Sequence, residues 1–194
     1  MAKFEVCAQQ WADLSQYGLG VAVINDSKYG YAVHDNVIRL SLLRSPKEPD
    51  PQADMGKHTF RYALMPHAYH GFQEAGVAQV AIAFNNPLRL IGSSAGEALR
   101  WNKFIACDCS AVVIDTLKIS EASTEQVPSV VVRVHETFES TCNAKMRMSF
   151  PVQKAVLCNM LEDDGEELFV TDNCVQLSFS PFEIKSIKFY LDRV

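Results

Sequence analysis

Apolar and polar positions alternate along much of the chain, and this two-residue period is typical of half-buried β-strands. Residues 37–44 place isoleucine and leucines on one face and arginine and serine on the other. Residues 58–65 alternate in the same way and are followed by Pro66, which cannot donate to a β-ladder and should end that strand. Residues 19–24 form a shorter apolar run. The N-terminal part of the chain is therefore predicted to be mainly β.

The segments between these runs carry turn, loop and helix signals. Asparagine, aspartate and glycine in residues 25–30 tolerate turn geometry, so we expect a hairpin there. Three prolines and a glycine in residues 45–56 predict a loop. Residues 72–84 are rich in alanine and carry a glutamate near their start, which predicts one short helix that Asn85-Asn86-Pro87 should end.

The alternation is lost in residues 90–101, where glycine and serine accumulate, and we expect a domain boundary near residue 95. Short strands then follow at regular spacing, as in a β-sandwich. The predicted strands are residues 111–119, 129–138, 144–150, 153–161, 168–171, 174–178 and 183–191. The pattern predicts an all-β protein in two parts: residues 1–95, with one short helix, and residues 96–194, an antiparallel β-sandwich.

The composition is that of a folded globular protein, and it narrows the choice of partners. Of the 194 residues, 48% are hydrophobic and 21% charged, and the net charge is −5. Without a cluster of lysine and arginine, this balance argues against nucleic acid or an anionic membrane as partner. No apolar run reaches the roughly 18 residues of a membrane span. Six cysteines without a C-x-x-C pair are expected to be reduced, with disulfides or zinc as the alternatives, and this favours a reducing compartment.

Candidate chemical groups each have a structural alternative. His67 and His70 could share a metal only with a third ligand, and none lies nearby in the sequence, so a loop-lining or surface role is favoured. Asp50 and Asp54 could act in acid–base catalysis, contact a ligand or form turns. The five acids of residues 162–167 lack the spacing of a calcium loop and predict a solvated hairpin. Common catalytic motifs are absent, so the residues alone indicate a β protein without a self-contained active site.

Several short segments of the sequence closely resemble the C-terminal half of the class II α-mannosidases, which form glycoside hydrolase family 38. The resemblance covers nearly the whole chain and is strongest before residue 90. The matching segments are residues 4–6, 11–15, 20–31, 40–46, 49–51, 53–54, 58, 60, 62–67, 75–77, 85–88, 161–162 and 179–184. The lysine and tyrosine that follow Asn25-Asp26 are similar to the cytosolic or vacuolar branch of the family.

The resemblance implies that this chain contains part of the family's fold and that the catalytic residues lie in another domain. Residues 1–95 would be a portion of the family's large central β-sandwich, and residues 96–194 its C-terminal β-sandwich. The family's members are retaining, zinc-dependent glycosidases of mannose and oligosaccharide metabolism. Their nucleophile and zinc ligands lie in an N-terminal catalytic domain that has no match here. We therefore assign no catalytic or metal-binding residue to this chain and expect it to be inactive without that domain.

In the family, some loops of the C-terminal domains reach the active-site rim, and this implies candidate substrate contacts. They lie in the turn at residues 25–31 and the loop at residues 44–58. The candidates are Asp26, Lys28, Tyr29, Arg44, Asp54 and His58. A tyrosine could stack on a pyranose face, and charged side chains could bond hydroxyl groups.

The resemblance also sets the expected partners and the competing function. The partners would be the chain's own catalytic domain and α-mannoside oligosaccharides, in the cytoplasm or alternatively the vacuole. A surface that docks a catalytic domain would be apolar and exposed in this chain alone, so we expect self-association. The alternative is a stand-alone carbohydrate-binding β-sandwich, against which stand the apolar surroundings of both tryptophans, Trp11 and Trp101.

Overall fold

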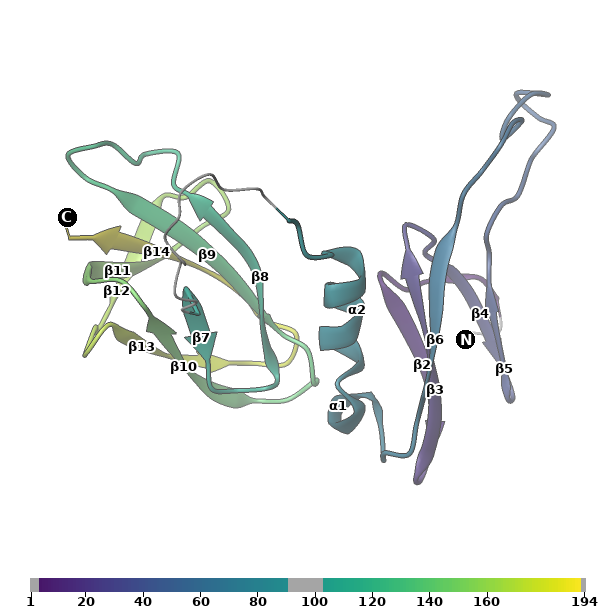
Figure 1. The fold of residues 1–194 in the computed structure, drawn as a ribbon, viewed down its shortest axis with the longest axis horizontal. Helices are drawn as coiled ribbons and strands as arrows, with labels where there is room; N and C mark the ends of the chain where they lie inside the picture. Colours follow the sequence, from purple (N-terminus) through teal and green to yellow (C-terminus); the bar gives the residue numbers. More distant parts are fainter. Residues whose placement is uncertain (1–3, 91–102, 193–194) are drawn as a thin grey trace. The chain divides into compact units, whose positions relative to one another are not determined.

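The computed structural model describes residues 4–90 and 103–192. The chain divides into two compact units, residues 1–92 (unit 1) and residues 93–194 (unit 2), each with sheets of its own (Figure 1). The boundary predicted near residue 95 lies outside the described residues. The assignment of residues 1–95 and 96–194 to particular mannosidase domains stays a prediction.

Unit 1 contains two three-stranded antiparallel sheets, with the strand orders β1-β4-β5 and β2-β3-β6. The strands are β1 (Val6–Cys7), β2 (Trp11–Gln16), β3 (Leu19–Asp26), β4 (Gly30–His34), β5 (Val37–Leu40) and β6 (Arg61–His67). The fully buried Tyr31 of β4 donates its hydroxyl hydrogen to the carbonyl oxygen of Val23 in β3 at 3.1 Å. A buried hydrogen bond therefore joins the two sheets.

Tight turns determine which strands of unit 1 pair. β2 and β3 form a hairpin around Gly18, which has a φ of +75°, and β4 and β5 form one around Asp35, with a φ of +51°. The hairpin predicted at residues 25–30 is wrong, because β3 and β4 lie in different sheets. The turn crosses between the sheets since the buried side chain of Asn25, in β3, bonds to the hydroxyl group of Tyr31 in β4.

Strand β6 begins and ends later than the alternation predicts. It includes Pro66, which lies opposite Val21 of β3, so the prediction that Pro66 ends the strand is wrong. Proline is tolerated there because β6 is an edge strand, and one side of its backbone has no ladder partner. β5 is shorter than predicted and ends at Leu40.

The single helix predicted over residues 72–84 is divided into α1 (Phe72–Ala75) and α2 (Val77–Asn85). Gly76 separates them with a φ of +66°, a left-handed conformation that glycine adopts without steric cost. Small buried side chains, Ala78 and Ala81 among them, let α2 approach β2 and β3 closely. The helices thus cover part of the β2-β3-β6 sheet.

Unit 2 is an antiparallel β-sandwich, as predicted. A five-stranded sheet of order β12-β11-β14-β9-β8 faces a three-stranded sheet of order β13-β10-β7 (Figure 1). The strands are β7 (Ile105–Cys107), β8 (Val112–Ile119), β9 (Ser129–Glu136), β10 (Cys142–Met148), β11 (Val152–Cys158), β12 (Asp164–Leu168), β13 (Cys174–Phe179) and β14 (Ile184–Leu191). Their inner faces enclose one core, to which Val132, Met146, Ile187 and Phe189 contribute fully buried side chains.

Two strands of unit 2 differ from the predictions. β7 is a short edge strand that the alternation does not reveal, and it pairs with β10. The strand predicted over residues 168–171 lies instead at Asp164–Leu168, so it begins inside the acidic run. The physical reason is that β12 is an edge strand without a buried face, and only its backbone pairing with β11 defines it.

All six cysteines are free thiols. Cys107, Cys109 and Cys142 pack against the core of unit 2, and burial raises the pKa of Cys142 to about 11. Cys7 in unit 1 is exposed. In the described part of the chain, no helix is long and apolar enough to cross a membrane.

Candidate functional site

A hollow of about 410 Å³ in unit 1 brings together four of the six predicted substrate contacts, namely Lys28, Tyr29, Arg44 and Asp54. Two of them lie in the turn between β3 and β4, and two lie in the loop that follows β5. We call this hollow the rim hollow. Residues that are distant in the sequence therefore share one surface.

One hydrogen bond to a side chain and one between backbone groups fix the turn that carries Lys28 and Tyr29. The N–H of Lys28 donates to Oδ1 of Asn25 at 3.2 Å, and the N–H of Ala8 donates to the carbonyl oxygen of Tyr29 at 2.9 Å. Ser27 adopts a φ of +68°, as a tight change of chain direction requires. This arrangement leaves the side chain of Tyr29 42% exposed.

The second wall is the proline-rich loop after β5. The N–H of Ser45 donates to Oδ2 of Asp54 at 3.0 Å and closes this loop where it begins. Both residues have positive φ angles, +50° for Ser45 and +59° for Asp54. Arg44 lies directly before this closure, is exposed, and makes no hydrogen bond or ion pair with another described residue.

His58 lies beside the rim hollow but is not part of its lining. Its Nε2 is 2.9 Å from the carbonyl oxygen of Asp54, and its ring stacks on Phe60 with the centroids 6.1 Å apart. Nζ of Lys28 lies 4.8 Å from the centroid of the same Phe60 ring. His58 and Phe60 therefore support both walls.

Asp26 is engaged away from the rim hollow. Its Oδ2 is 3.3 Å from Nε of Arg61 at the start of β6. Arg61 also lies over the ring of Phe84 and donates to its carbonyl oxygen at 2.8 Å. The carboxylate of Asp26 thus links the end of β3 to β6.

Sequence reasoning missed two residues of this region. Glu5 lines the rim hollow, and Phe60 contacts Lys28 as described. A Cβ on Gly30 would lie 2.2 Å from Oε1 of Glu5, so glycine at this position leaves room for the carboxylate. Both residues lie in segments that resemble the family, and this resemblance was the signal that could have identified them.

The rim hollow combines hydrogen-bond donors, acceptors and an aromatic ring. Lys28 and Arg44 can only donate, ionised Asp54 and Glu5 can only accept, and Tyr29 offers a ring face. Hydrogen-bond donors and acceptors beside an exposed aromatic ring suit a neutral ligand rich in hydroxyl groups. Within residues 4–90 and 103–192, no group of three or more His, Cys, Asp or Glu side chains could hold a metal ion.

His67 and His70, the candidate metal pair, have different partners. Nε2 of His67 lies 2.9 Å from Oδ1 of Asp13, and these side chains are 1% and 4% exposed. Nδ1 of His67 is buried without a hydrogen-bond partner in the described part of the chain. The ring of His70 contacts that of Tyr17 in a tilted arrangement, with the centroids 4.2 Å apart. The two imidazoles do not converge on one ligand.

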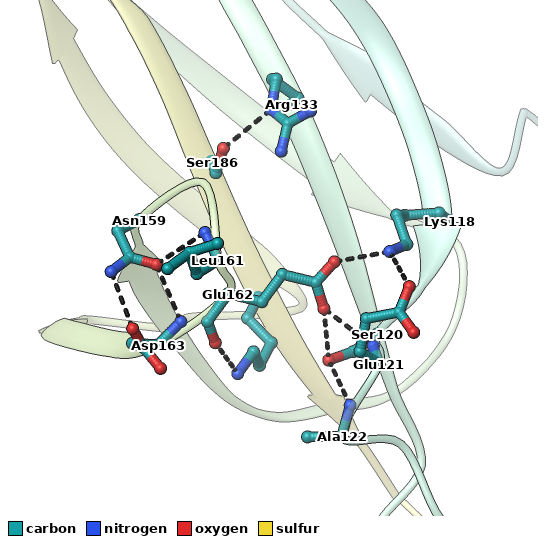
Figure 2. A network of polar contacts seen from close by, with 11 residues as sticks. Lys118, Ser120, Glu121, Ala122, Arg133, Asn159, Leu161, Glu162, Asp163 and Ser186 are labelled. Carbon is teal, nitrogen blue, oxygen red and sulfur yellow. Dashed lines mark hydrogen bonds and ion pairs between the residues drawn. The ribbon is translucent and has the colours of Figure 1, made fainter.

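The acidic run of unit 2 lies in the hairpin between β11 and β12, as predicted, and four of its five acids are exposed, but Glu162 is buried. Its carboxylate accepts hydrogen bonds from Nζ of Lys118 at 2.7 Å, Oγ of Ser120 at 2.9 Å and the N–H of Glu121 at 2.8 Å (Figure 2). These donors, Lys118 above all, lower the pKa of Glu162 from 4.5 to about 2. Asn159 shapes the same turn by accepting two backbone N–H bonds. The network ties the β11–β12 turn to the end of β8.

A second carboxylate of the run neutralises a buried lysine. Oδ1 of Asp164 lies 2.7 Å from Nζ of Lys188, whose side chain is 4% exposed, and Oδ2 accepts from the hydroxyl of Tyr190 at 2.5 Å. The hydrogen bond from Lys188 lowers the pKa of Asp164 below its ordinary value. Lys188 also donates to the carbonyl oxygen of Glu162. This cluster holds strands together and presents no open ligand site.

Two sequence profiles of one family match the chain. The profile for the glycosyl hydrolases family 38 C-terminal domain matches residues 1–52. The profile for the glycosyl hydrolases family 38 C-terminal beta sandwich domain matches residues 111–187, within the sandwich of unit 2.

Curated proteins match over nearly the whole chain. Alpha-mannosidase 2C1 of Homo sapiens is 44% identical over 189 residues, which cover 96% of this chain and 18% of that protein. Alpha-mannosidase G of Dictyostelium discoideum is 37% identical, with 97% and 17% covered. Alpha-mannosidase of Saccharomyces cerevisiae is 30% identical, with 98% and 19% covered. The chain thus spans less than a fifth of the length of these relatives.

Solved structures share the fold. A protein in the glycosyl hydrolase family 38 from Enterococcus faecalis has a TM-score of 0.72 at 18% identity and covers 98% of this chain and 23% of its own. An alpha-mannosidase from Enterococcus faecalis V583 has a TM-score of 0.68 at 19% identity, with 99% and 22% covered. The predicted fold class and the family resemblance are both confirmed: the chain belongs to glycosyl hydrolase family 38 and forms the C-terminal region of such a protein.

Proposed function

We propose that this chain is the non-catalytic C-terminal region of an α-mannosidase, where it braces the catalytic domain and contributes side chains to the active-site rim. The observation that carries the rim assignment is the meeting of Lys28, Tyr29, Arg44 and Asp54 in one hollow. The chain spans 18% of its human relative, so most of such a protein, including its catalytic machinery, lies outside it.

The chemistry of the rim hollow suits an α-mannoside oligosaccharide. A pyranose offers hydroxyl groups at its edge and apolar C–H groups on its faces. The exposed ring of Tyr29 can stack on such a face, and the unpaired guanidinium of Arg44 can donate to two hydroxyl oxygens. One carboxylate oxygen of Asp54 is held by Ser45, and the other can accept from a sugar hydroxyl. In this proposal His58 and Phe60 support the walls of the hollow, and Asp26 links β3 to β6.

Zinc and the reacting carboxylates belong, in this proposal, to the catalytic domain. The described residues of this chain do not fit a metal ion, so no step of the reaction is assigned to them. The reaction of the whole protein would be hydrolysis of an α-mannoside with retention of configuration. We place the protein in the cytoplasm, which suits six free thiols, with the vacuole as the alternative.

The proposal is tested by comparing the purified chain with the full-length protein on an aryl α-mannoside. We expect chelator-sensitive turnover from the full-length protein, and neither turnover nor stoichiometric zinc binding from the chain alone. A full-length protein truncated before this region should lose activity through loss of its brace. Chelator-sensitive turnover by the chain alone, or full activity without this region, would refute the proposal.

A further inference from the structure

The turn that carries Lys28 and Tyr29 is built around a completely buried asparagine. Asn25 is 0% exposed and sits near the end of β3. Its Oδ1 accepts the N–H of Lys28 at 3.2 Å, and its Nδ2 donates to the hydroxyl oxygen of Tyr31 at 2.8 Å and to the carbonyl oxygen of Ala8 at 3.3 Å. Both ends of the Asn25 amide are therefore used within unit 1.

These bonds form a closed ring around the turn. Ala8, whose carbonyl oxygen accepts from Asn25, donates its own N–H to the carbonyl oxygen of Tyr29 at 2.9 Å. The backbone of the turn is thus held from both sides, at Lys28 by Asn25 directly and at Tyr29 through Ala8. A buried amide with matched partners has little freedom to rearrange, because any unpaired polar group would cost free energy.

Helix α2 connects to the same point through its last residue. Nδ2 of Asn85 donates to the carbonyl oxygen of Asn25 at 3.0 Å and to that of Ala81 in its own helix at 2.9 Å. The next residue, Asn86, makes a comparable bond to the carbonyl oxygen of Ile82 at 3.0 Å but does not reach β3. Both asparagines therefore donate to a carbonyl oxygen in the last turn of α2, and only Asn85 also links α2 to the end of β3.

We infer that Asn25 and Asn85 are positioning residues for substrate: Asn25 sets the geometry of the turn bearing Lys28 and Tyr29, and Asn85 couples that turn to α2. This inference rests on the proposed function, since it takes the rim hollow as the place where the sugar binds. It assigns a role to two residues that lie outside the lining of the hollow.

The test compares Asn85→Ala with Asn86→Ala in the full-length α-mannosidase. Both variants lose a bond to a helix carbonyl, and only Asn85→Ala also removes the donor to the backbone carbonyl oxygen of Asn25. We expect Asn85→Ala to raise KM for an oligomannoside about three- to tenfold, as loss of an ordered contact predicts, with kcat unchanged within about twofold. Asn86→Ala should keep the wild-type KM, and both variants should remain folded at the assay temperature.

Hydrogen–deuterium exchange supplies a second readout that does not depend on activity. We expect the amide of Lys28 to exchange at least about tenfold faster in Asn85→Ala than in Asn86→Ala, while residues 45–56 exchange equally in both. Asn25→Ala should accelerate the same amide further; if it fails to fold, the Asn85 comparison still decides. Equal exchange and equal KM in Asn85→Ala and Asn86→Ala would overturn the inference.

The inference and the proposed function fail in different ways. Arg44→Ala and Tyr29→Ala remove rim side chains and leave Asn25 and Asn85 in place. If these variants raise KM and Asn85→Ala does not, the inference is wrong and the rim assignment stands. If Arg44→Ala and Tyr29→Ala leave KM unchanged, the rim assignment fails, and the inference fails with it.

Discussion

Nε2 of His67 lies 2.9 Å from Oδ1 of Asp13, and the imidazole reaches this carboxylate by crossing Gly20. His67 in β6 is directly opposite Gly20 in β3, while Asp13 lies on β2, the next strand of the sheet. A Cβ at Gly20 would lie 2.3 Å from Cε1 of His67 and 2.7 Å from Cβ of Ser15. The absence of a side chain on the central strand thus allows one buried pair to join all three strands.

We therefore predict that Gly20→Ala destabilises the chain by about 3 kcal/mol, because the added methyl group overpacks the site and separates His67 from Asp13. The measurement is urea unfolding followed by tryptophan fluorescence. Gly71→Ala is the control, since its Cβ would meet only the terminal amide oxygen of the Gln73 side chain. A free energy of unfolding for Gly20→Ala equal to that of Gly71→Ala would contradict the prediction.

Glu162 makes the stability of unit 2 depend on pH in the acid range. Its folded pKa of about 2 is below the ordinary 4.5, so the carboxylate stabilises the fold fully above pH 4.5. That contribution is lost as the pH falls from about 4.5 to 2. Glu162→Gln should lower the free energy of unfolding by about 2 kcal/mol at pH 7 and flatten its pH dependence over this window. Glu121→Gln is the control, because Glu121 is 81% exposed; equal pH profiles for both variants would count against this role.

Asp164 and Asp163 are neighbours that should respond differently to truncation. Asp164→Ala leaves the buried ammonium of Lys188 without its carboxylate and should cost about 2 kcal/mol, less than for a fully buried pair because Asp164 is 40% exposed. Asp163→Ala removes only a bond from the exposed amide of Asn159 and should change stability by less than about 0.5 kcal/mol. The measurement is urea unfolding of both variants. Equal losses in the free energy of unfolding would contradict the assignment of Asp164 as the partner of Lys188.

Unit 1 exposes apolar side chains that a soluble monomer seldom leaves uncovered. Leu19 and Leu64 are 55% and 66% exposed and line a hollow of about 760 Å³ together with Val21. We predict that sedimentation velocity detects concentration-dependent self-association of the chain and that Leu64→Ser weakens it. Leu88→Ser is the control, since Leu88 is 99% exposed and lies outside this hollow. A clean monomer at high concentration would contradict the prediction.

The alternation predicted strands well where one face of a strand is buried. β9 and β10 lie close to their predicted positions because buried side chains such as Val132 and Met146 recur every second residue. β12 has no buried face, so no period marks it. The prediction at Pro66 is wrong because the effect of a proline depends on whether its strand has a partner on both sides. The alternation of residues does not indicate the order of the strands, so it does not show that β6 is an edge strand.

The sequence predicts the segments that line the rim hollow but not how these segments come together. Turn chemistry indicated the segments that hold Lys28 and Arg44, but residues 25–30 cross between sheets and do not form a hairpin. The pairing of Asp26 with Arg61 removes one candidate from the rim hollow, and 34 intervening positions separate the residues without any periodic signal. Likewise, a run of acids does not reveal that Glu162 is the buried one, because its donors Lys118 and Ser120 lie 44 and 42 residues earlier.

The most direct test of the rim assignment is the steady-state kinetics of Arg44→Ala and Tyr29→Ala in the full-length α-mannosidase, with an oligomannoside as substrate. The controls are Arg39→Ala and Tyr17→Ala, which truncate exposed residues of the same types outside the rim hollow. We predict that kcat/KM falls by the equivalent of about 1–3 kcal/mol in the rim variants and stays at the wild-type value in the controls. Rim variants that fold normally and keep wild-type kcat/KM would contradict it and leave the region as a brace alone.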